Sequence, residues 1–332
     1  MIFVWILILL VCLYFLTKAA DYFTDAAEKI GIIFKLPTFV IGLLVVTFGT
    51  TAPELVTSIF SILDNEPGIV AGNIAGTIVA NIFLGLGLAV VISRKTARFH
   101  WDNVSNDMPF LLGSLVLLAL TIYDGQFSFF EAIIFLVSYS VYVFYALHIR
   151  KISPKEIRLD LNKEIRSRFH KNLKANKTNK ISAQQAVRLV ITFISSLAVI
   201  ILSAKYAVET LIISAHILNI ATPALAASII AIGTSLPEIS VAVSSARKGH
   251  FDLVLGNIMG ACIFDTLVIF GVIGLFTTIF IPEIVINFIL PVAIAAVLIQ
   301  WLVTLDKKIT VTEGLLMLIL YFTFIIKLYK IF

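Results

Sequence analysis

Apolar residues follow one another along most of this chain in long runs, and short polar connections separate these runs. A helix that crosses a bilayer needs about 20 predominantly apolar residues, so each run of that length predicts a membrane-spanning helix. Ten are expected, at residues 2–24, 38–62, 68–92, 107–123, 127–148, 186–213, 221–246, 252–277, 283–304 and 311–330. The pattern therefore predicts an all-α membrane protein with ten transmembrane helices.

The two halves of the chain share one sequence pattern. The eleven residues Gly49–Ile59 recur as Gly233–Val243, and this offset of 184 positions continues without a gap to Asn81 and Asp265. Because each half holds an odd number of expected helices, the second half must enter the membrane from the opposite side. We expect two inverted five-helix repeats, at 1–149 and 186–332, with a linker at 150–185; the duplicated segments are about 38–92 and 221–277.

Composition agrees with a membrane location. Sixty per cent of the residues are hydrophobic, the mean hydropathy is +1.04 and only 14% of the residues are charged, which excludes a water-soluble globular protein. The opening run Met1–Leu16 lacks a basic region and a cleavage site, so we expect a retained first span and not a signal peptide.

The distribution of lysine and arginine predicts which side each connection faces, because these residues collect in cytoplasmic loops. Alternate connections hold 22 of the 25 basic residues, at about 18–35, 94–98, 150–188, 247–248 and 307–308. The intervening connections hold none, whereas Lys327 and Lys330 run against the rule. The aligned segments Asp64–Glu66 and Lys248–His250 even have opposite charge. We expect a multi-pass protein of the cell membrane with both termini outside and the linker in the cytoplasm.

The stretch at 150–182 carries eleven basic residues against three acidic ones. We interpret it as a solvated determinant of topology. A second interpretation is binding to anionic lipid headgroups, where each basic residue contributes on the order of 1 kcal/mol. No aromatic or glycine pattern accompanies the charge, so nucleic acid is not an expected partner.

Several kinds of chemistry are not indicated. Cys12 and Cys262 stand singly in apolar runs, so no disulfide is expected. The histidines have no metal-ligand spacing; they are His100, His148, His170, His216 and His250. No nucleophile–base pair or phosphate-binding loop is present in the sequence. We therefore expect no enzyme activity, no cofactor and no use of ATP.

Three acidic residues lie well inside expected spans: Glu54, Glu238 and Asp265. An ionised side chain in the middle of a membrane costs roughly 2.5–3.5 kcal/mol on insertion scales and needs a partner. No lysine or arginine lies at comparable depth except Lys205, which lies near the end of a span. The compensation is therefore expected from bound cations or protons. The alternative is a protonated glutamate that donates one hydrogen bond between helices.

Each of the two glutamates follows a proline, which has no N–H to donate to the carbonyl four residues earlier. Pro53 and Pro237 therefore predict a break in each helix, and free carbonyls are tolerated in a membrane where a cation replaces the missing hydrogen. Thr50 lies one turn before Glu54, and Thr234 one turn before Glu238. Carbonyl, hydroxyl and carboxylate oxygens suit Ca²⁺ or Na⁺ and not zinc or copper. The alternative is an ordinary proline kink.

The helix after each break carries a second polar pattern. Asn73, Thr77 and Asn81 are spaced by four residues and form a stripe on one helix face. The aligned residues are Asn257, Ala261 and Asp265. Glycines four apart, Gly72 and Gly76 and then Gly256 and Gly260, are expected to allow close helix packing. The stripe is either part of the cation site or a set of interhelical hydrogen bonds.

At these residues the chain resembles the cation/calcium exchanger superfamily, and more closely its sodium/calcium exchanger branch. The first motif reads Gly49-Thr50-Thr51-Ala52-Pro53-Glu54 and Gly233-Thr234-Ser235-Leu236-Pro237-Glu238. The second begins at Gly72-Asn73 and at Gly256-Asn257. The resemblance implies two inverted repeats around a midplane ion site, with Glu54 and Glu238 binding Ca²⁺ and sharing Na⁺. The residues implied to bind cations are Glu54, Glu238, Asn81, Asp265, Thr50, Thr234, Thr51, Ser235, Thr77, Asn73, Asn257, Thr47 and Ala231, the Thr47 and Ala231 positions through their carbonyls.

The chain departs from the pattern of this family at four positions. Members usually have serine at Thr77 and Ala261, and Ala261 has no side-chain oxygen for a sodium ion. The asparagine that follows in the family is replaced by Ile78 and Cys262. One Na⁺ site is therefore expected to be weakened, which leaves the stoichiometry open. Asp265 resembles an acid of potassium-dependent members but does not settle K⁺ use.

The function that these features predict is secondary antiport of Ca²⁺ against Na⁺ by alternating access. The depleted Na⁺ ligands and the three acids leave H⁺/Ca²⁺ or K⁺-dependent exchange as the alternative. A more remote alternative is a non-transporting membrane receptor or scaffold that acts through the basic linker.

Overall fold

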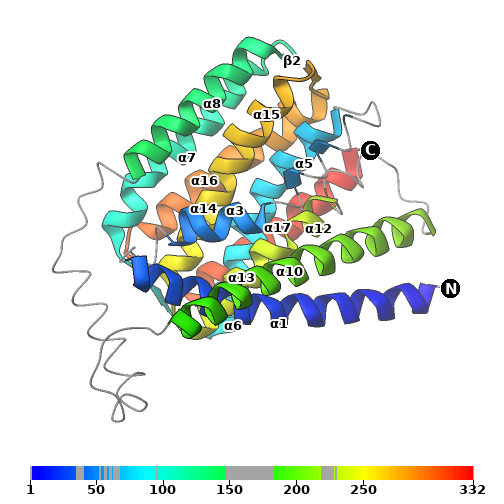
Figure 1. Ribbon diagram of the computed structural model, residues 1–332. Coiled ribbons are helices and arrows are strands. Elements are labelled where there is room, and N and C mark those ends of the chain that lie inside the picture. The colour runs from blue at the N-terminus through cyan, green and yellow to red at the C-terminus, as the bar shows by residue number, and fades with distance from the viewer. Residues whose placement is uncertain are drawn as a thin grey trace.

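The computed structural model describes residues 2–34, 41–51, 54–55, 58–59, 62, 68–94, 96–146, 183–217, 228 and 230–331. Pro53, the connection at 63–67 and the linker at 150–182 lie outside these residues. The described chain is helical apart from four two-residue strands (Figure 1), as the hydrophobic pattern predicts. Five of its helices are long and apolar enough to cross a membrane: Ile69–Ser93, Val104–Thr121, Phe251–Gly274, Val285–Thr304 and Val311–Lys330. Three shorter helical stretches are also apolar: Ile41–Thr50, Phe129–Phe144 and Val187–Ser203.

The first half contains π-helical segments as well as α-helices and short strands. In order they are α1 (Ile2–Phe34), η1 (Ile41–Val46, a π-helical segment), α3 (Thr47–Thr50), α5 (Gly68–Val79), η2 (Ala80–Leu86, π-helical), α6 (Gly87–Ser93), β1 (Ala97–Arg98), α7 (Trp101–Thr121), β2 (Gln126–Phe127) and α8 (Phe129–Phe144).

The second half follows a similar order. Its elements are α10 (Ala183–Ile217), α12 (Ala231–Thr234), α13 (Leu236–Lys248), α14 (Phe251–Phe264), η7 (Asp265–Ile269, π-helical), α15 (Phe270–Gly274), β3 (Ile279–Phe280), η8 (Val285–Ile289, π-helical), α16 (Leu290–Thr304), β4 (Lys308–Ile309) and α17 (Val311–Ile331).

Helix α1 is longer than the apolar run that predicts it, because it continues for ten residues beyond residue 24 to Phe34. In this extension Ala26 and Ala27 are buried, whereas Lys29 is exposed. The end of α1 is therefore amphipathic, and a search for apolar residues alone misses such a segment. Helix α7 similarly begins at Trp101, six residues before the predicted start, in a first turn that carries Asp102 and Asn103.

Helices α1 and α10 lie side by side at one edge of the molecule and run in opposite directions (Figure 1). The rings of Phe23 and Phe193 stack where the two helices meet, with centroids 4.7 Å apart. Small residues, Ala19, Ala20 and Ala27, face the rest of the bundle in a hydrophobic cluster of their own. This pair of helices therefore forms a layer that is distinct from the main hydrophobic core.

The two small sheets show which connections lie at the same end of the bundle. Strand β1 pairs with β4, and these strands belong to the two basic connections near residues 97 and 308. Strand β2 pairs with β3, and these belong to two connections without lysine or arginine. The charge pattern predicts the same grouping, since it assigns each pair of connections to one side of the membrane.

The most enclosed helices are the two that carry the predicted polar stripes. Every side chain of α14 except that of Asp252 is buried, and α5 with η2 is buried at most positions. Segment η1 packs directly on α14, and α6 packs on α13. Residues from the two halves therefore meet in the centre of the protein, where polar side chains lack access to water.

Candidate cation site

The helix that carries each copy of the proline–glutamate motif is interrupted, as the prolines predict. In the second half α12 ends at Thr234, Ser235 adopts φ −74° and ψ −4°, and α13 begins at Leu236 with Pro237 in its first turn. In the first half α3 ends at Thr50, and Thr51 has almost the same backbone angles, φ −79° and ψ 3°. The helix of the second half is therefore interrupted at Ser235, and α3 of the first half ends next to the aligned Thr51, while Pro53 itself lies outside the described part of the chain.

The hydroxyl groups at the breaks bond to the preceding turn. Thr51 Oγ1 donates to the Thr47 carbonyl at 2.9 Å, and Ser235 Oγ donates to the Ala231 carbonyl at 2.7 Å. These are the carbonyls that the family resemblance implies as cation ligands. The hydroxyl groups of Thr51 and Ser235 already occupy lone pairs of these carbonyl oxygens. An ion that binds there therefore competes with the two hydroxyl groups.

The threonine before each break reaches across to the other half of the protein. Thr50 Oγ1 donates to Asn257 Oδ1 at 3.5 Å, and Thr234 Oγ1 donates to Asn73 Oδ1 at 3.4 Å. These two contacts are related by the 184-residue offset, with the halves exchanged. Each half therefore supplies the threonine of one contact and the asparagine of the other.

Both glutamates are buried in this region without a protein partner. Glu54 is 0% exposed and Glu238 is 1% exposed. Among the described residues, neither carboxylate oxygen of either side chain has a hydrogen-bond partner. Thr234 lies near the Glu54 carboxyl group and Thr50 near that of Glu238. Each glutamate thus lies beside the threonine of the other half.

Asp265 and Asn81 lie at equivalent places, and the structure gives both an irregular backbone. Asn81 lies in the π-helical segment η2 and Asp265 begins the π-helical segment η7. Both side chains are 0% exposed, and within the described chain neither has a partner for its polar side-chain atoms. Single π-helical turns inside α-helices occur frequently at functional sites. The sequence gives no signal for this feature, because π-helical turns have no simple residue pattern.

The remaining stripe residues are divided between the two interpretations. Thr77 Oγ1 and Asn73 Nδ2 are buried and have no partner within the described chain. Asn257 Nδ2, by contrast, donates to the Glu238 carbonyl at 3.4 Å. Ala261, also buried, has no oxygen in its side chain. The stripe therefore combines interhelical hydrogen bonds at Asn73 and Asn257 with unsatisfied polar groups deeper in the bundle.

Two glycines bring the halves into contact beside this region. A Cβ atom on Gly260 would lie 2.5 Å from the Leu43 carbonyl oxygen and 2.5 Å from Thr47 Oγ1. A Cβ atom on Gly42 would lie 2.6 Å from the Leu253 carbonyl oxygen. The packing role predicted for Gly260 is confirmed, and Gly42 is a partner that sequence reasoning missed. The same role is wrong for Gly72, because a Cβ atom added there would come no closer than 3.9 Å to its nearest neighbour, a side-chain atom of Val285.

The charges of this region decide what it can bind. The carboxyl groups of Glu54, Glu238 and Asp265 lie close enough to repel one another when ionised. Within the described residues, no three histidine, cysteine, aspartate or glutamate side chains approach closely enough to hold one metal ion together. We call these residues the central site: Glu54, Glu238, Asp265, Asn81, Thr50, Thr234, Asn73, Asn257 and Thr77.

Buried carboxylates without partners are costly, because their desolvation is repaid only by an opposite charge or by hydrogen bonds. In the central site the unsatisfied atoms are mostly acceptor oxygens, which a cation can coordinate. Gln300, another buried side chain without a partner in the described chain, carries no charge. These buried oxygens make the central site a candidate to hold a cation.

Comparisons with known proteins agree with this chemistry. The family model described as "Sodium/calcium exchanger protein" matches residues 4–148 and 188–330. The chain is 32% identical over 352 aligned positions to "Sodium/calcium exchanger MaX1" of Methanosarcina acetivorans, and the match covers 100% of both chains. It is 28% identical to "Inner membrane protein YrbG" of Escherichia coli, over 81% of this chain and 79% of that one.

Solved structures show the same fold. A structure of the sodium-calcium exchanger NCX_Mj, soaked with 2.5 mM Na⁺ and 10 mM Sr²⁺, matches with a TM-score of 0.77 and 25% identity. The match covers 97% of this chain and 98% of the other. The chain is accordingly a multi-pass membrane transporter and not an enzyme, which sets aside the receptor or scaffold alternative. From its buried carboxylates, its duplicated motifs and these matches together, this chain belongs to the sodium/calcium exchanger family.

Proposed function

We propose that this protein exchanges Ca²⁺ for Na⁺ across the cell membrane by giving the central site access to each side in turn. The observation that carries the proposal is the set of buried carboxylate oxygens without protein partners at Glu54, Glu238 and Asp265. Relatives named as sodium/calcium exchangers support the choice of ions.

The ligands available suit this pair of ions. Ca²⁺ takes six to eight oxygens in flexible geometry. Glu54 and Glu238 supply up to four carboxylate oxygens, and the hydroxyl groups of Thr50 and Thr234 lie beside them. Two glutamates balance the charge of one Ca²⁺ or of two monovalent cations. Because the two kinds of ion compete for the same carboxylates, release of one allows binding of the other, which couples their transport.

The two halves do not offer equal numbers of oxygens for Na⁺. Thr47 and Thr77 of the first half carry hydroxyl groups, whereas the aligned Ala231 and Ala261 of the second half carry none. The Thr47 hydroxyl is already directed to the Gly42 and Asn257 carbonyls, at 3.0 and 3.2 Å. We therefore propose that Na⁺ binds more weakly beside Ala261 than beside Thr77, and that fewer Na⁺ ions are exchanged for each Ca²⁺ than in relatives with serine at both positions.

For the topology we propose ten transmembrane helices as two inverted repeats, residues 1–149 and 186–332, with both termini outside and the linker at 150–185 in the cytoplasm. The opposite directions of α1 and α10 and the exchanged contacts of Thr50 and Thr234 support an inverted relation. Pairing of β1 with β4 supports a common side for the basic connections. The linker's basic residues would then face anionic headgroups of the inner leaflet.

The transport reaction is tested by loading proteoliposomes with Na⁺ and measuring uptake of radiolabelled Ca²⁺. We expect uptake driven by an outward Na⁺ gradient, abolished when the gradient is removed and independent of added ATP. Because the protein has no nucleotide site in this proposal, uptake that requires ATP would contradict it. Uptake that ignores reversal of the Na⁺ gradient would exclude Na⁺ as the counter-ion.

A second candidate is exchange that depends on H⁺ or K⁺, and the unpartnered carboxyl group of Asp265 favours it. Asp265→Asn keeps the shape of the side chain and restores symmetry with Asn81. We expect this variant to keep Ca²⁺ flux within about tenfold of the original, because Glu54 and Glu238 remain and Asp265 has no hydrogen-bond partner in the described chain to lose. Fluxes measured while Na⁺, K⁺ and pH are varied separately distinguish the candidates: a variant that loses only its K⁺ or pH dependence assigns that coupling to Asp265. Complete loss of flux would instead make Asp265 a required Ca²⁺ ligand.

A further inference from the structure

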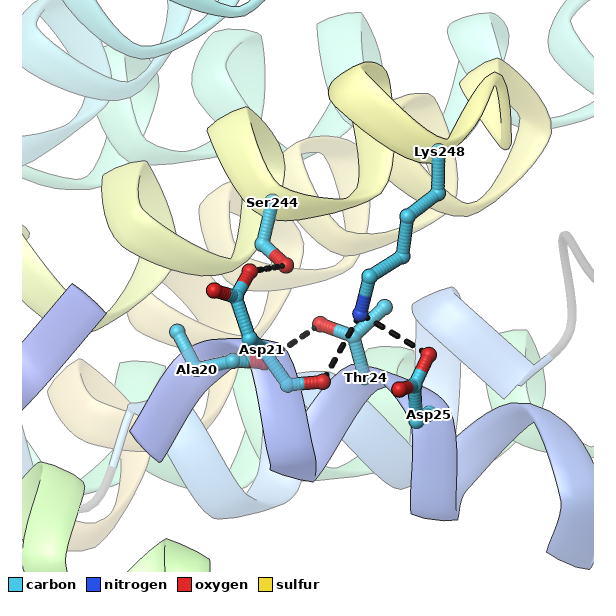
Figure 2. A network of polar contacts seen from close by, with 6 residues as sticks. All are labelled: Ala20, Asp21, Thr24, Asp25, Ser244 and Lys248. Carbon is cyan, nitrogen blue, oxygen red and sulfur yellow. Dashed lines mark hydrogen bonds and ion pairs between the residues drawn. The ribbon is translucent and has the colours of Figure 1, made fainter. Parts of the chain in front are cut away.

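A polar network joins α1 to the end of α13, the helix that begins beside Glu238. Figure 2 shows Lys248 extending from α13 towards α1, where its ammonium group lies 2.9 Å from Asp25 Oδ1. The same group donates to the main-chain carbonyl of Asp21 at 2.7 Å. One turn earlier on α13, Ser244 Oγ donates to Asp21 Oδ1 at 2.6 Å. Three polar contacts therefore hold these two helices together.

The structure of α13 holds Lys248 in place. Gly249 has φ +87°, a conformation that L-residues rarely adopt, and its N–H donates to the Ala246 carbonyl at 3.0 Å. The N–H of His250 donates to the Ser245 carbonyl, also at 3.0 Å. These two bonds form a helix cap that stops α13 directly after Lys248. With 18% of its side chain exposed, Lys248 is mostly enclosed, so its charge is less screened than that of a surface lysine.

The network lies at the end of the bundle that carries the basic connections, which we call the basic end: residues 94–100, 247–252 and 305–310. Asp252, just after α13, bonds to His100 at 2.9 Å, and β1 pairs with β4 at the same end. From Glu238 to Lys248 is ten residues, or about 15 Å along the helix. Between these two residues every side chain of α13 except those of Val243 and Arg247 is buried. Along α13, protein side chains therefore separate Glu238 from the basic end.

The sequence does not repeat this network at the opposite end. Under the 184-residue offset Lys248 aligns with Asp64, and Ser244 aligns with Phe60. Lys205 of α10, which aligns with Asp21, forms its ion pair with Glu209 on the same helix at 3.7 Å, and both side chains are about half exposed or more. A pair within one helix does not restrain one helix against another. Among the described residues, the Lys248 network therefore joins α1 and α13 at the basic end.

We propose that Lys248 is a lock on the transport cycle: its contacts with Asp25 and Asp21 hold α1 against α13, favour the state in which the basic end is closed, and must break before ions reach the central site from that end. This inference rests on the proposed alternation of access. In this proposal one ion pair sets the relative populations of the states in which the basic end is closed and open. Loss of that pair shifts the balance by about tenfold towards opening, the usual effect of one partly buried charged hydrogen bond.

The population is measured by chemical labelling of a cysteine that is buried only while the basic end is closed. Ser245 of α13 is 0% exposed and lies one turn from Lys248. Ser245→Cys is placed in a protein whose own cysteines, Cys12 and Cys262, are replaced by alanine. The purified protein is treated with N-ethylmaleimide in detergent, without ion gradients. We expect Lys248→Met, which keeps the length of the side chain, to raise the labelling rate about tenfold.

The matched control is Lys205→Met, which removes a lysine whose pair lies within one helix. We expect its labelling rate to stay within about twofold of the background. Equal rates in Lys248→Met and the background protein overturn the proposal, as does an equal increase in Lys205→Met. If Lys248→Met is not monodisperse, Asp25→Asn takes its place, because it removes one partner and leaves the bond to the Asp21 carbonyl; it is expected to raise the rate severalfold, and an unchanged rate overturns the proposal.

Labelling requires no transport, so it separates the lock from the proposed function. A protein without Ca²⁺ exchange in liposomes would end the proposed function, whereas the labelling rates would still decide the lock. In proteoliposomes of known orientation, Lys248→Met is expected to lower the apparent dissociation constant for Ca²⁺ at the basic end by up to the same factor. The value at the other end is expected to change less than about twofold, since the closed state remains the major one. Equal changes at both ends would contradict a lock at one end.

Discussion

Glutamine at Glu54 or at Glu238 is expected to abolish Ca²⁺ exchange while the protein remains folded. Each change keeps the shape of the side chain and one oxygen, but it removes a negative charge from a buried site. Removing one member of a buried charge pair costs about 3–5 kcal/mol, so Ca²⁺ binding should weaken by more than about a hundredfold. Stability should not fall, because these carboxylates have no hydrogen-bond partner in the described protein to lose. Ca²⁺ flux in proteoliposomes, with protein that remains monodisperse, measures the effect.

Glu209→Gln is the matched control, because Glu209 is about half exposed and pairs with Lys205 on its own helix. Its flux should equal that of the original protein. Asp265→Asn provides the comparison within the central site, where a milder loss is expected. Flux at the original level in Glu54→Gln or Glu238→Gln would remove these carboxylates from the Ca²⁺ site, whatever other residues contribute.

Alanine at Gly260 or Gly42 is expected to cause the largest loss of stability. The new Cβ atom would lie 2.5 Å from a main-chain carbonyl oxygen in the first variant and 2.6 Å in the second. Neither carbonyl oxygen can move away unless η1 separates from α14. Such overpacking typically costs about 1–3 kcal/mol or more. The same separation would pull Thr50 away from Asn257. We expect the thermal unfolding midpoint to fall by on the order of 5 °C, with a parallel loss of Ca²⁺ flux.

Gly113 of α7 offers the control, since a Cβ atom there meets nothing within 4 Å. Gly113→Ala should unfold at the same temperature or slightly higher, because alanine favours a helix by up to about 1 kcal/mol over glycine. Thermal unfolding of the purified variants in one detergent compares the three. If Gly260→Ala unfolded at the same temperature as Gly113→Ala, the close approach of η1 and α14 would not limit stability.

Lys248 and Gly42 illustrate what pattern reasoning misses. The repeat offset draws attention to residues that occur in both halves, such as Glu54 and Glu238. Lys248 has an acid as its aligned residue, and Gly42 aligns with Ala226, so neither stands out in that comparison. Their importance comes from what lies opposite them: Asp25 on α1 in one case, and the Leu253 carbonyl on α14 in the other.

The sequence by itself determined the helical membrane class, the duplicated motifs, the interruption near Thr51 and Ser235, and the acids of the central site. These features depend on local or one-dimensional information: the length of apolar runs, the missing N–H of proline, and the cost of a charge in a membrane. Only the tertiary structure decided that Thr50 meets Asn257 while Thr234 meets Asn73, and that Asn81 and Asp265 lie in π-helical turns. Those two hydrogen bonds join residues more than 150 positions apart, so they depend on packing across the halves and not on the order of residues within either one.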